Sequence, residues 1–394
     1  MVGKRKLGGL AVAVAAFAGV GISSAGAADA GPDFWQVAAG ARHACAITDT
    51  GELYCWGDDG RGQLGNGSDL GSDTRPRRVD LLARVWMAAL GADFTCAMAG
   101  GLIEMDAYCW GANDRGQLGL GTVSEREESP RRLSAMPGPV RSIAAGGAHA
   151  CLTVRGRQDA LFCWGDNRFG QLGIGSVSAY EASPAHVADF FGGGSPLGDD
   201  STCMDDLFGH AYCWGRNDRG QLGDGTRTNR SVPTRVKGLD TVYNVSSAGS
   251  HACALTTSSR VKCWGDNTMG QLGNGGSGVS TRPVAVRGLP RNPSWLSMGQ
   301  RHSCAVDYDT QKMFCWGDNR SGQLGDGTLT VRRTPVPVQR LGRTYYEAAM
   351  GNRFTCVRNP DTTLKCWGAN EIGQLGNGTT IPRRWPTSVA DPVS

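Results

Sequence analysis

Short apolar runs alternate with glycine-containing polar turns along most of the chain. The segment 46–54, Ala-Ile-Thr-Asp-Thr-Gly-Glu-Leu-Tyr, is typical, because two β-prone runs flank a turn that contains glycine. This is the pattern of a β-hairpin. Further along, a proline precedes another short apolar run, such as Val-Ala-Val at 284–286. The second pattern predicts a further strand that begins at the proline and lies at a sheet edge.

The same pattern recurs seven times. Each copy contains Cys-Trp-Gly, and Gly-Gln-Leu-Gly begins seven residues after its cysteine. Successive copies are 50 to 54 residues apart and cover the chain from Trp35 to Val389. A unit of three or four short strands is marginal alone and must bury its faces against neighbouring units. We therefore predict an all-β fold, a seven-bladed β-propeller of about four-stranded blades with one repeat per blade; an open solenoid is the alternative.

Two blocks of each unit resemble the signatures of the regulator of chromosome condensation repeat family. The segment 264–273, Trp-Gly-Asp-Asn-Thr-Met-Gly-Gln-Leu-Gly, is the fullest copy of one block, and Ala-Gly-x-x-His is the other. The resemblance covers essentially all of the chain after its first 30 residues. It implies a seven-bladed propeller of four-stranded blades, closed by pairing strands from the two chain ends. Members of this family have unrelated functions, so the resemblance does not identify a partner.

The first residues have the order of parts of a secretory signal peptide. Lys4, Arg5 and Lys6 precede an apolar run at 10–20, and Ala-Gly-Ala at 25–27 fits a cleavage site. We expect residues 1–27 to be the signal peptide, with cleavage at 27–30, and residues 31–394 to be a single seven-repeat domain. The apolar run is too short for the alternative, a membrane anchor. Export would place the protein in an extracellular or periplasmic compartment, as a secreted bacterial-type member of the family.

Charge argues against two classes of partner. The formal net charge is +4, and loss of the three basic residues of the leader lowers it to about +1. A nearly neutral chain has no general attraction for nucleic acid phosphates or anionic lipids. We therefore expect no nucleic acid partner and, after removal of the signal peptide, no membrane contact.

The fourteen cysteines number two per unit. In a hairpin centred on Thr50, Cys45 faces Cys55, and directly opposed residues lie within reach of a disulfide. Metal binding is one alternative, but two thiolates per unit are too few for a closed zinc site; buried free thiols are the other. We predict seven disulfides within the units: Cys45–Cys55, Cys96–Cys109, Cys151–Cys163, Cys203–Cys213, Cys253–Cys263, Cys304–Cys315 and Cys356–Cys366.

The sequence contains no recognisable catalytic or metal-binding constellation. Four histidines share one position of the repeat, but that position is Phe or Ser in the other units. A position that accepts Phe serves packing, so we expect these histidines to be structural. Four acids flank Cys203; we expect a solvated loop there, although a cation site is the alternative. The histidines are His43, His149, His251 and His302, and the acids are Asp199, Asp200, Asp205 and Asp206. We expect no enzyme activity, no cofactor and no metal.

The two residues before each Gly-Gln-Leu-Gly vary while the surrounding residues repeat. Several of them are Arg, Phe, Met or Ile, which are side chains enriched in binding surfaces. Variation on a solvated rim without function is the alternative. The Asn or Asp before each pair is expected to cap the turn locally. The candidate binding rim comprises Arg61, Arg115, Arg168, Phe169, Arg219, Met269, Arg320 and Ile372.

The fourth unit departs from the other six. It is preceded by Asp-Phe-Phe-Gly-Gly-Gly-Ser at 189–195, and its Ala-Gly block is reduced to Leu-Gly-Asp at 197–199. The Phe pair is either an exposed docking element or part of a loosened blade.

These features predict a secreted, disulfide-stabilised, monomeric propeller that binds a protein or glycan without catalysis, with enzyme inhibition as a special case. The alternative is guanine-nucleotide exchange or chromatin-type regulation, as in the namesake of the family. The signal peptide, the paired cysteines and the nearly neutral charge all oppose that alternative.

Overall fold

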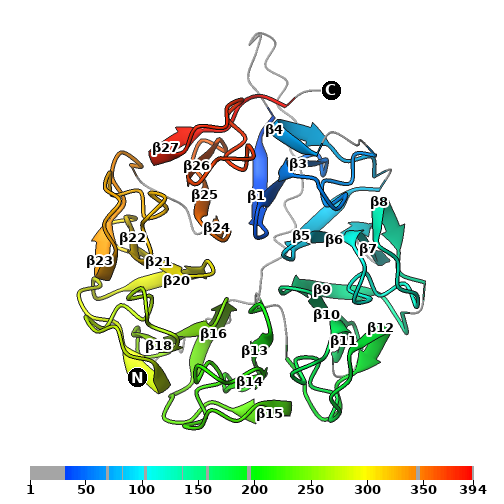
Figure 1. Ribbon diagram of the computed structural model, residues 1–394, viewed down its shortest axis with the longest axis horizontal. Coiled ribbons are helices and arrows are strands. Elements are labelled where there is room, and N and C mark those ends of the chain that lie inside the picture. The colour runs from blue at the N-terminus through cyan, green and yellow to red at the C-terminus, as the bar shows by residue number, and fades with distance from the viewer. Residues whose placement is uncertain are drawn as a thin grey trace, which may run out of the picture.

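The protein is a ring of seven antiparallel sheets around a central axis (Figure 1). The computed structural model describes residues 32–67, 71–81, 83–101, 104–134, 136–156, 159–192, 197–342 and 347–392. The expected signal peptide lies outside these residues. Within them the chain forms 27 strands, and it contains no helix long and apolar enough to cross a bilayer. The predicted all-β, seven-bladed propeller is confirmed.

The sheets follow one another in chain order, and in each sheet the strands run from the axis outwards (Figure 1). The first three sheets contain β1 (Phe34–Ala39), β2 (His43–Thr48), β3 (Leu53–Asp58) and β4 (Ser72–Arg78); β5 (Val85–Leu90), β6 (Phe94–Gly100), β7 (Met105–Ala112) and β8 (Arg126–Arg132); and β9 (Val140–Ala145), β10 (His149–Val154), β11 (Ala160–Asp166) and β12 (Tyr180–His186). The fourth contains β13 (Ser201–Asp205), β14 (Ala211–Gly215) and β15 (Arg230–Arg235). The last three contain β16 (Val242–Ala248), β17 (His251–Thr256), β18 (Val261–Gly265) and β19 (Ser280–Ala285); β20 (Pro293–Met298), β21 (His302–Asp307), β22 (Met313–Gly317) and β23 (Arg332–Pro337); and β24 (Ala348–Met350), β25 (Phe354–Arg358), β26 (Leu364–Gly368) and β27 (Arg383–Ser388).

The fourth sheet has three strands among the described residues, whereas the other six sheets have four. A single antiparallel bridge joins Gly192 to Asp206 just before the place where an innermost strand would run. Residues 193–196 are outside the described part of the chain.

The repeated prolines lie inside the outer strands, which corrects the expectation that they begin them. Pro283 is the fourth residue of β19. Pairing of β18 with β19 shifts register between Cys263 and Gly265, so residues 281–283 have no partner in the register of β18. Proline is tolerated there because a bulge on an edge strand needs no ladder hydrogen bond from that residue.

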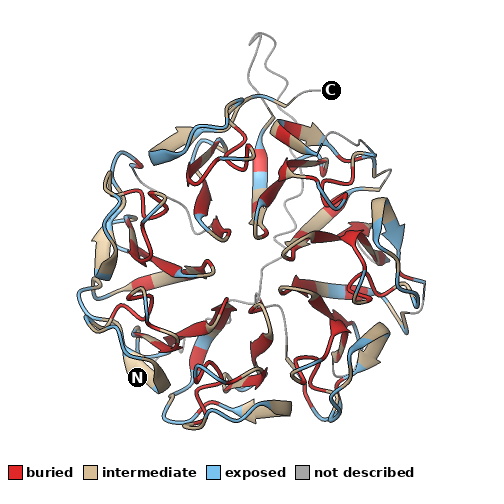
Figure 2. Ribbon diagram, in the orientation of Figure 1, coloured by how far each residue is buried: buried red, intermediate tan, exposed pale blue. Residues whose placement is uncertain are grey.

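A tryptophan joins each sheet to the one before it. The indole Nε1 of Trp110 donates a hydrogen bond to the backbone oxygen of Gln63 at 3.0 Å. Gly65 makes room for this ring, since its φ is 68° and a Cβ there would lie 2.4 Å from the indole nitrogen. All seven tryptophans of Cys-Trp-Gly are fully buried, and buried residues concentrate on the middle strands (Figure 2). They are Trp56, Trp110, Trp164, Trp214, Trp264, Trp316 and Trp367.

The ring closes through the same contact. Trp56, in the first sheet, donates its indole hydrogen to the backbone oxygen of Gln374, in the last unit, at 3.1 Å. Each of the seven described sheets comes from one continuous stretch of chain, so closure by strands from both chain ends, which the resemblance implied, is wrong. Because the loop of the seventh unit reaches the first tryptophan, closure requires no exchanged strand.

Each sheet carries one disulfide between its two middle strands. In the first sheet Ala46 pairs with Tyr54 and Cys45 pairs with Cys55, which is the register of the expected hairpin. Across the seven bonds the Cα atoms are 4.0–4.2 Å apart, and the cysteines are buried. The bonds join Cys45–Cys55, Cys96–Cys109, Cys151–Cys163, Cys203–Cys213, Cys253–Cys263, Cys304–Cys315 and Cys356–Cys366.

Two local hydrogen bonds hold the loop after the third strand of every sheet. The side-chain oxygen of an Asn accepts from the backbone of the Leu in Gly-Gln-Leu-Gly, as Asn217 does from Leu222 at 3.0 Å. The Gln side chain accepts from the residue two positions before it, as Gln221 does from Arg219 at 2.8 Å. The first unit has Asp59 in place of Asn, and burial raises the pKa of this carboxyl to about 6.

Four of the seven interfaces between sheets contain a buried histidine. His43 Nε2 lies 2.8 Å from Thr95 Oγ1 of the next sheet. Thr95 Oγ1 donates its hydrogen to the backbone oxygen of Gln63, so the histidine must be the donor to the threonine. The same chain of contacts includes His149–Thr202, His251–Ser303 and His302–Thr355. We call this arrangement the histidine clasp.

The two positions of the clasp vary together around the ring. Where one sheet has His, the next has Thr or Ser at the facing position. Where the first position is Phe94, Ser201 or Phe354, the next sheet has alanine. Those alanines are Ala150, Ala252 and Ala44. The expectation that these histidines are structural agrees with this pairing, because a hydroxyl occurs only where a buried imidazole needs an acceptor.

Removal of one partner from the first clasp should cost more than removal of both. We expect T95A to lower the free energy of unfolding by about 1–3 kcal/mol, because it leaves a buried imidazole N–H without an acceptor. The double variant H43F/T95A has the residues of the two Phe–Ala interfaces and should recover most of that loss. Urea unfolding of the oxidised protein measures both; additive losses in the double variant would contradict the clasp.

The clasp should also make stability depend on pH. Burial lowers the pKa of His43 from 6.5 to about 3. Below pH 6.5 the unfolded chain therefore takes up a proton that the folded protein does not, and stability falls as the pH decreases. Between about pH 6 and pH 4, H43F/T95A should lose about 1.4 kcal/mol less per pH unit than the wild type. Equal slopes in urea unfolding at several pH values would show that His43 is protonated in the folded state.

Candidate functional site

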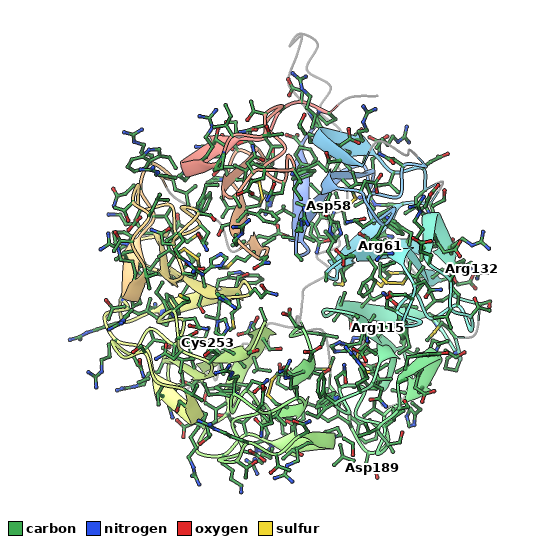
Figure 3. All side chains as sticks on the ribbon, in the orientation of Figure 1. Asp58, Arg61, Arg115, Arg132, Asp189 and Cys253 are labelled. Carbon is green, nitrogen blue, oxygen red and sulfur yellow. A yellow bond between two sulfur atoms is a disulfide. The ribbon has the colours of Figure 1, made fainter. Side chains whose placement is uncertain are left out.

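The loops that follow the third strands emerge at one end of the ring, which we call the loop face. The turns between the first and second strands lie at the same end. Ion pairs join the two sets of loops, as between Arg42 and Asp58 at 3.2 Å and between Arg353 and Glu371 at 3.5 Å. Arg61 projects over the second sheet and Arg115 over the third (Figure 3), in agreement with their ion pairs to Glu125 and Asp166 of those sheets.

The structure places all eight candidate rim residues in these loops. Because the backbone around them is held by the same hydrogen bonds in every unit, their side chains face outwards. Four are exposed and four are half-buried, and they are spread around the ring rather than gathered at one point. The exposed ones are Arg61, Arg168, Arg219 and Arg320, and the half-buried ones are Arg115, Phe169, Met269 and Ile372.

One group of side chains on the loop face is centred on Phe169. Arg216 lies 5.0 Å from the centre of its ring, and Arg168 lies 5.8 Å from it, so two cations flank one aromatic face. Arg216 also forms ion pairs with Asp200 at 3.1 Å and with Asp218 at 2.9 Å. An aromatic side chain held between arginines combines the residue types that dominate binding energy at protein interfaces.

Buried carboxylates orient two of the rim arginines. Asp166 is 2% exposed and accepts two hydrogen bonds from Arg168, while Arg115 lies 3.5 Å away. Arg320 binds Asp318 in the same bidentate manner. Burial raises the pKa of Asp318, but the hydrogen bonds from Arg320 outweigh it and hold the pKa below its ordinary value. In both arginines, two hydrogen bonds to a buried carboxylate fix one edge of the guanidinium, and the opposite edge faces solvent.

Sequence reasoning missed four arginines of the same face. Arg216 follows Trp-Gly in the fourth unit, where the other units have Asp or Ala. Arg42, Arg301 and Arg353 precede the His or Phe of the clasp position, and this position also varies among units. The signal was available, because both positions vary within a repeated frame, as the chosen rim positions do.

A hollow of about 360 Å³ lies on the loop face between the seventh and first sheets. Arg42, Arg353 and Ile372 line it together with Glu371 and Gln374. One residue of the candidate rim, Ile372, thus borders a concave surface that contains cations from both ends of the chain.

The four acids around Cys203 do not form a cluster. Asp199 and Asp200 precede β13, and Asp205 and Asp206 lie at its other end. In the described part of the chain no group of three or more His, Cys, Asp or Glu side chains could hold a metal ion. The four clasp histidines are buried with Nε2 engaged, and this geometry leaves no histidine of that position on the surface.

Comparison with known proteins agrees with the repeat pattern. A family model described as an RCC1-like domain matches residues 22–305, and models of the regulator of chromosome condensation (RCC1) repeat match residues 296–323 and 312–358. The ultraviolet-B receptor UVR8 of Arabidopsis thaliana is 31% identical over 363 residues, which is 89% of this chain and 80% of the receptor.

Solved structures share the fold at lower identity. Yeast RCC1 (Prp20), crystallised with Kap60, is similar with a TM-score of 0.74 at 21% identity, covering 86% of this chain and 83% of that one. Human WBSCR16 is similar with a TM-score of 0.72 at 22% identity, covering 82% and 86%. The family model spans most of this chain, and the receptor is matched over most of its own length. The protein is therefore a member of the family of RCC1-like domains.

Proposed function

We propose that the protein is exported and binds a protein or glycan through the loop face, without catalysing a reaction. The observation that carries this proposal is the loop face itself. A repeated frame of hydrogen bonds holds seven loops, and each loop carries Arg, Phe, Met or Ile at one or both of its two variable positions. Binding residues are commonly found on loops that a rigid scaffold positions.

Two features support export. The first residues have the composition of a signal peptide, although they lie outside the described residues. Fourteen cysteines form seven buried disulfides, one in each sheet. Disulfides persist in oxidising compartments and are rare in the cytosol.

A protein is the ligand class that we favour. The loop face mixes arginines with carboxylates, as the Arg216 contacts show, and such mixed surfaces complement other mixed protein surfaces. Yeast RCC1, which shares the fold, was crystallised with the protein Kap60. The fold is thus compatible with a protein partner, while the argument for this chain rests on its own loops. We expect the protein itself to be a monomer.

The mass of the exported protein tests compartment and disulfides together. The full chain is expressed with its leader and recovered outside the cytoplasm. We then expect the mass of a mature chain whose first residue lies between 28 and 31. Reduction should add one hydrogen per cysteine, fourteen in all. Alkylation of most thiols without reduction, or retention of the leader, would contradict the export proposal.

The loop face is tested with matched arginine variants. Arg61 and Arg219 are exposed and hold no buried carboxylate, so R61A/R219A should fold normally. R260A/R291A removes two exposed arginines that are not part of the loop face and is the control. We expect wild type and control to capture the same proteins from extracellular or periplasmic extract after cross-linking. The amount of these proteins captured by R61A/R219A should be about tenfold lower. The same captured set in all three would contradict the proposal.

A further inference from the structure

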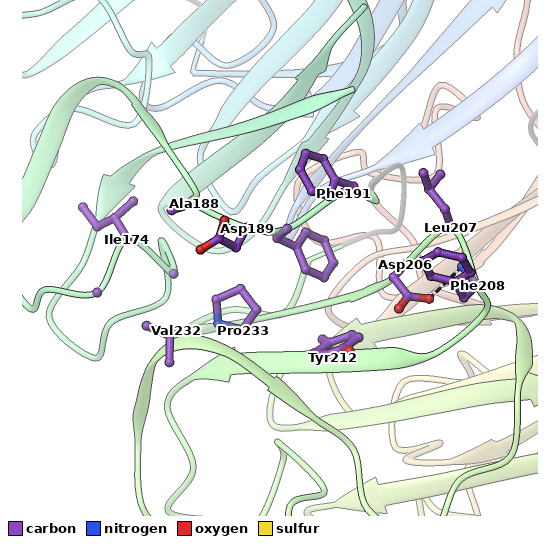
Figure 4. A pocket seen from close by; sticks show the side chains of 13 residues that line it. Ile174, Ala188, Asp189, Phe191, Asp206, Leu207, Phe208, Tyr212, Val232 and Pro233 are labelled. Atoms are coloured by element: carbon purple, nitrogen blue, oxygen red, sulfur yellow. Dashed lines mark hydrogen bonds between the residues drawn. The ribbon is translucent and has the colours of Figure 1, made fainter. Parts of the chain in front are cut away.

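The fourth unit contains a groove that the proposed function does not use. A cavity of about 510 Å³ is lined mainly by apolar side chains from four segments of the chain. Ile174 comes from the loop of the third unit, Phe191 from the connection before β13, and Leu207 and Phe208 from the hairpin after β13 (Figure 4). Val232 on β15 lines the remaining side. We call this the fourth-unit groove.

The hairpin side of the groove lies at the end of the ring opposite the loop face, whereas Ile174 belongs to a loop that starts on the loop face. Asp199 and Asp200 lead into β13 from the loop face, where Asp200 pairs with Arg216. The hairpin that contains Leu207 and Phe208 follows the other end of the same strand. None of the eight candidate rim residues lines the groove, so a ligand bound there would leave the candidate rim free.

The hairpin tip exposes large apolar side chains that the fold does not require. Leu207 is 67% exposed and Phe208 is 79% exposed. The corresponding tip of the first unit is Asp-Thr-Gly at 49–51, and that of the fifth is Thr-Ser-Ser-Arg at 257–260. Polar tips close the same hairpin in the first and fifth units, and Tyr308 is the only large apolar side chain exposed at the tip of the sixth, residues 308–312. The fold therefore does not require adjacent Leu and Phe there, and their exposure indicates an interaction surface.

Contacts beneath and across the groove show that it is preformed. Phe190 is buried and packs edge-on against Tyr212 and Trp214, with ring centres 5.6 and 5.4 Å away. The backbone of Leu207 donates to the oxygen of Phe191 at 3.3 Å. Of the two interpretations of the Phe pair, these contacts favour a docking element over a loosened blade, since one ring is an anchor and the next is at the surface.

The charged residues that line the groove are both acidic. The carboxylate of Asp206 accepts hydrogen bonds from the backbone of Phe208 and of His210, and it also pairs with the His210 ring. Asp189 has no hydrogen-bond or ion-pair partner among the described residues, and it is exposed beside Ile174 and Ala188 (Figure 4). A cationic group beside an apolar ligand would therefore meet an available carboxylate.

We propose that the fourth-unit groove binds a segment of another protein that has bulky apolar side chains next to a lysine or arginine. The apolar lining would take the bulky side chains, and Asp189 would select the adjacent cation. The volume is in the range of pockets that bind ligands, and an open groove with apolar walls suits an extended or helical peptide.

A phage-displayed library of random twelve-residue peptides is the probe. The oxidised protein is used for selection, and L207S/F208S, which changes only exposed side chains of the hairpin tip, is used for counter-selection. We expect the enriched peptides to contain two or more bulky apolar residues next to Lys or Arg. A synthetic peptide from the pool should bind L207S/F208S about tenfold more weakly than wild type, with unchanged thermal unfolding.

The basic residue is tested separately. D189N should lower the affinity for the peptide about fivefold. The same peptide with norleucine in place of its lysine or arginine should bind wild type and D189N with equal affinity. The loop-face variant R61A/R219A should bind the peptide as wild type does, so failure of the groove and failure of the loop face are distinguishable.

Three outcomes would overturn the proposal. One is a selected pool that binds L207S/F208S as well as wild type. The second is a pool without basic residues, or one that D189N leaves unaffected. The third is a concentration-dependent dimer in sedimentation that L207S/F208S dissociates, because the groove would then be covered by a second copy of this chain.

Discussion

The hydrogen bond from a buried tryptophan to the backbone of the preceding unit is the contact on which the ring depends. The indole has a large apolar surface and one polar N–H. The backbone oxygen of the glutamine accepts that hydrogen, so the indole is buried without leaving an unpaired donor. The glycine two positions after that glutamine allows the close approach. Gly-Gln-Leu-Gly thus forms a turn in its own unit and packs against the tryptophan of the next unit. Trp214 is the exception, since its nitrogen has no partner among the described residues. It lies in the fourth unit, where Phe190 packs against the same indole.

Much of the fold could be predicted because its determinants are local and repeated. The pairing of Cys45 with Cys55 follows from hairpin register, and seven copies of the same spacing support it. The closure of the ring could not be predicted from any one unit, because it depends on Trp56 meeting Gln374 at the far end of the chain. The position of the prolines was misjudged because a bulge in the outer strand is a property of the pairing rather than of the proline.

The positions of the candidate rim in the loops were predictable in outline for the same reason. Variation inside a constant frame identified the loop positions, and the structure shows the hydrogen bonds that keep the frame constant. The role of the histidines was harder to see, because each hydroxyl partner lies about fifty residues later in the chain. The pairing of His with Thr or Ser, and of Phe with Ala, is nevertheless visible when neighbouring units are compared in register. Arg216 escaped notice because its position was treated as part of the motif.

Every covalent cross-link stays within one sheet, and the last sheet meets the first through the same tryptophan-to-backbone hydrogen bond as at five of the other six joints. The place where the polypeptide starts is therefore arbitrary with respect to the ring. A gene rearranged to begin at any other unit would encode the same set of joints, provided that the old termini were linked. Recombination that adds or deletes a whole unit would keep the tryptophan-to-backbone contacts, but it would preserve a buried clasp only where the new neighbours again match His with Thr or Ser. Divergence of a single member is absorbed locally: the fourth unit lacks the indole hydrogen bond, and Phe190 of the adjoining connection packs against the same Trp214.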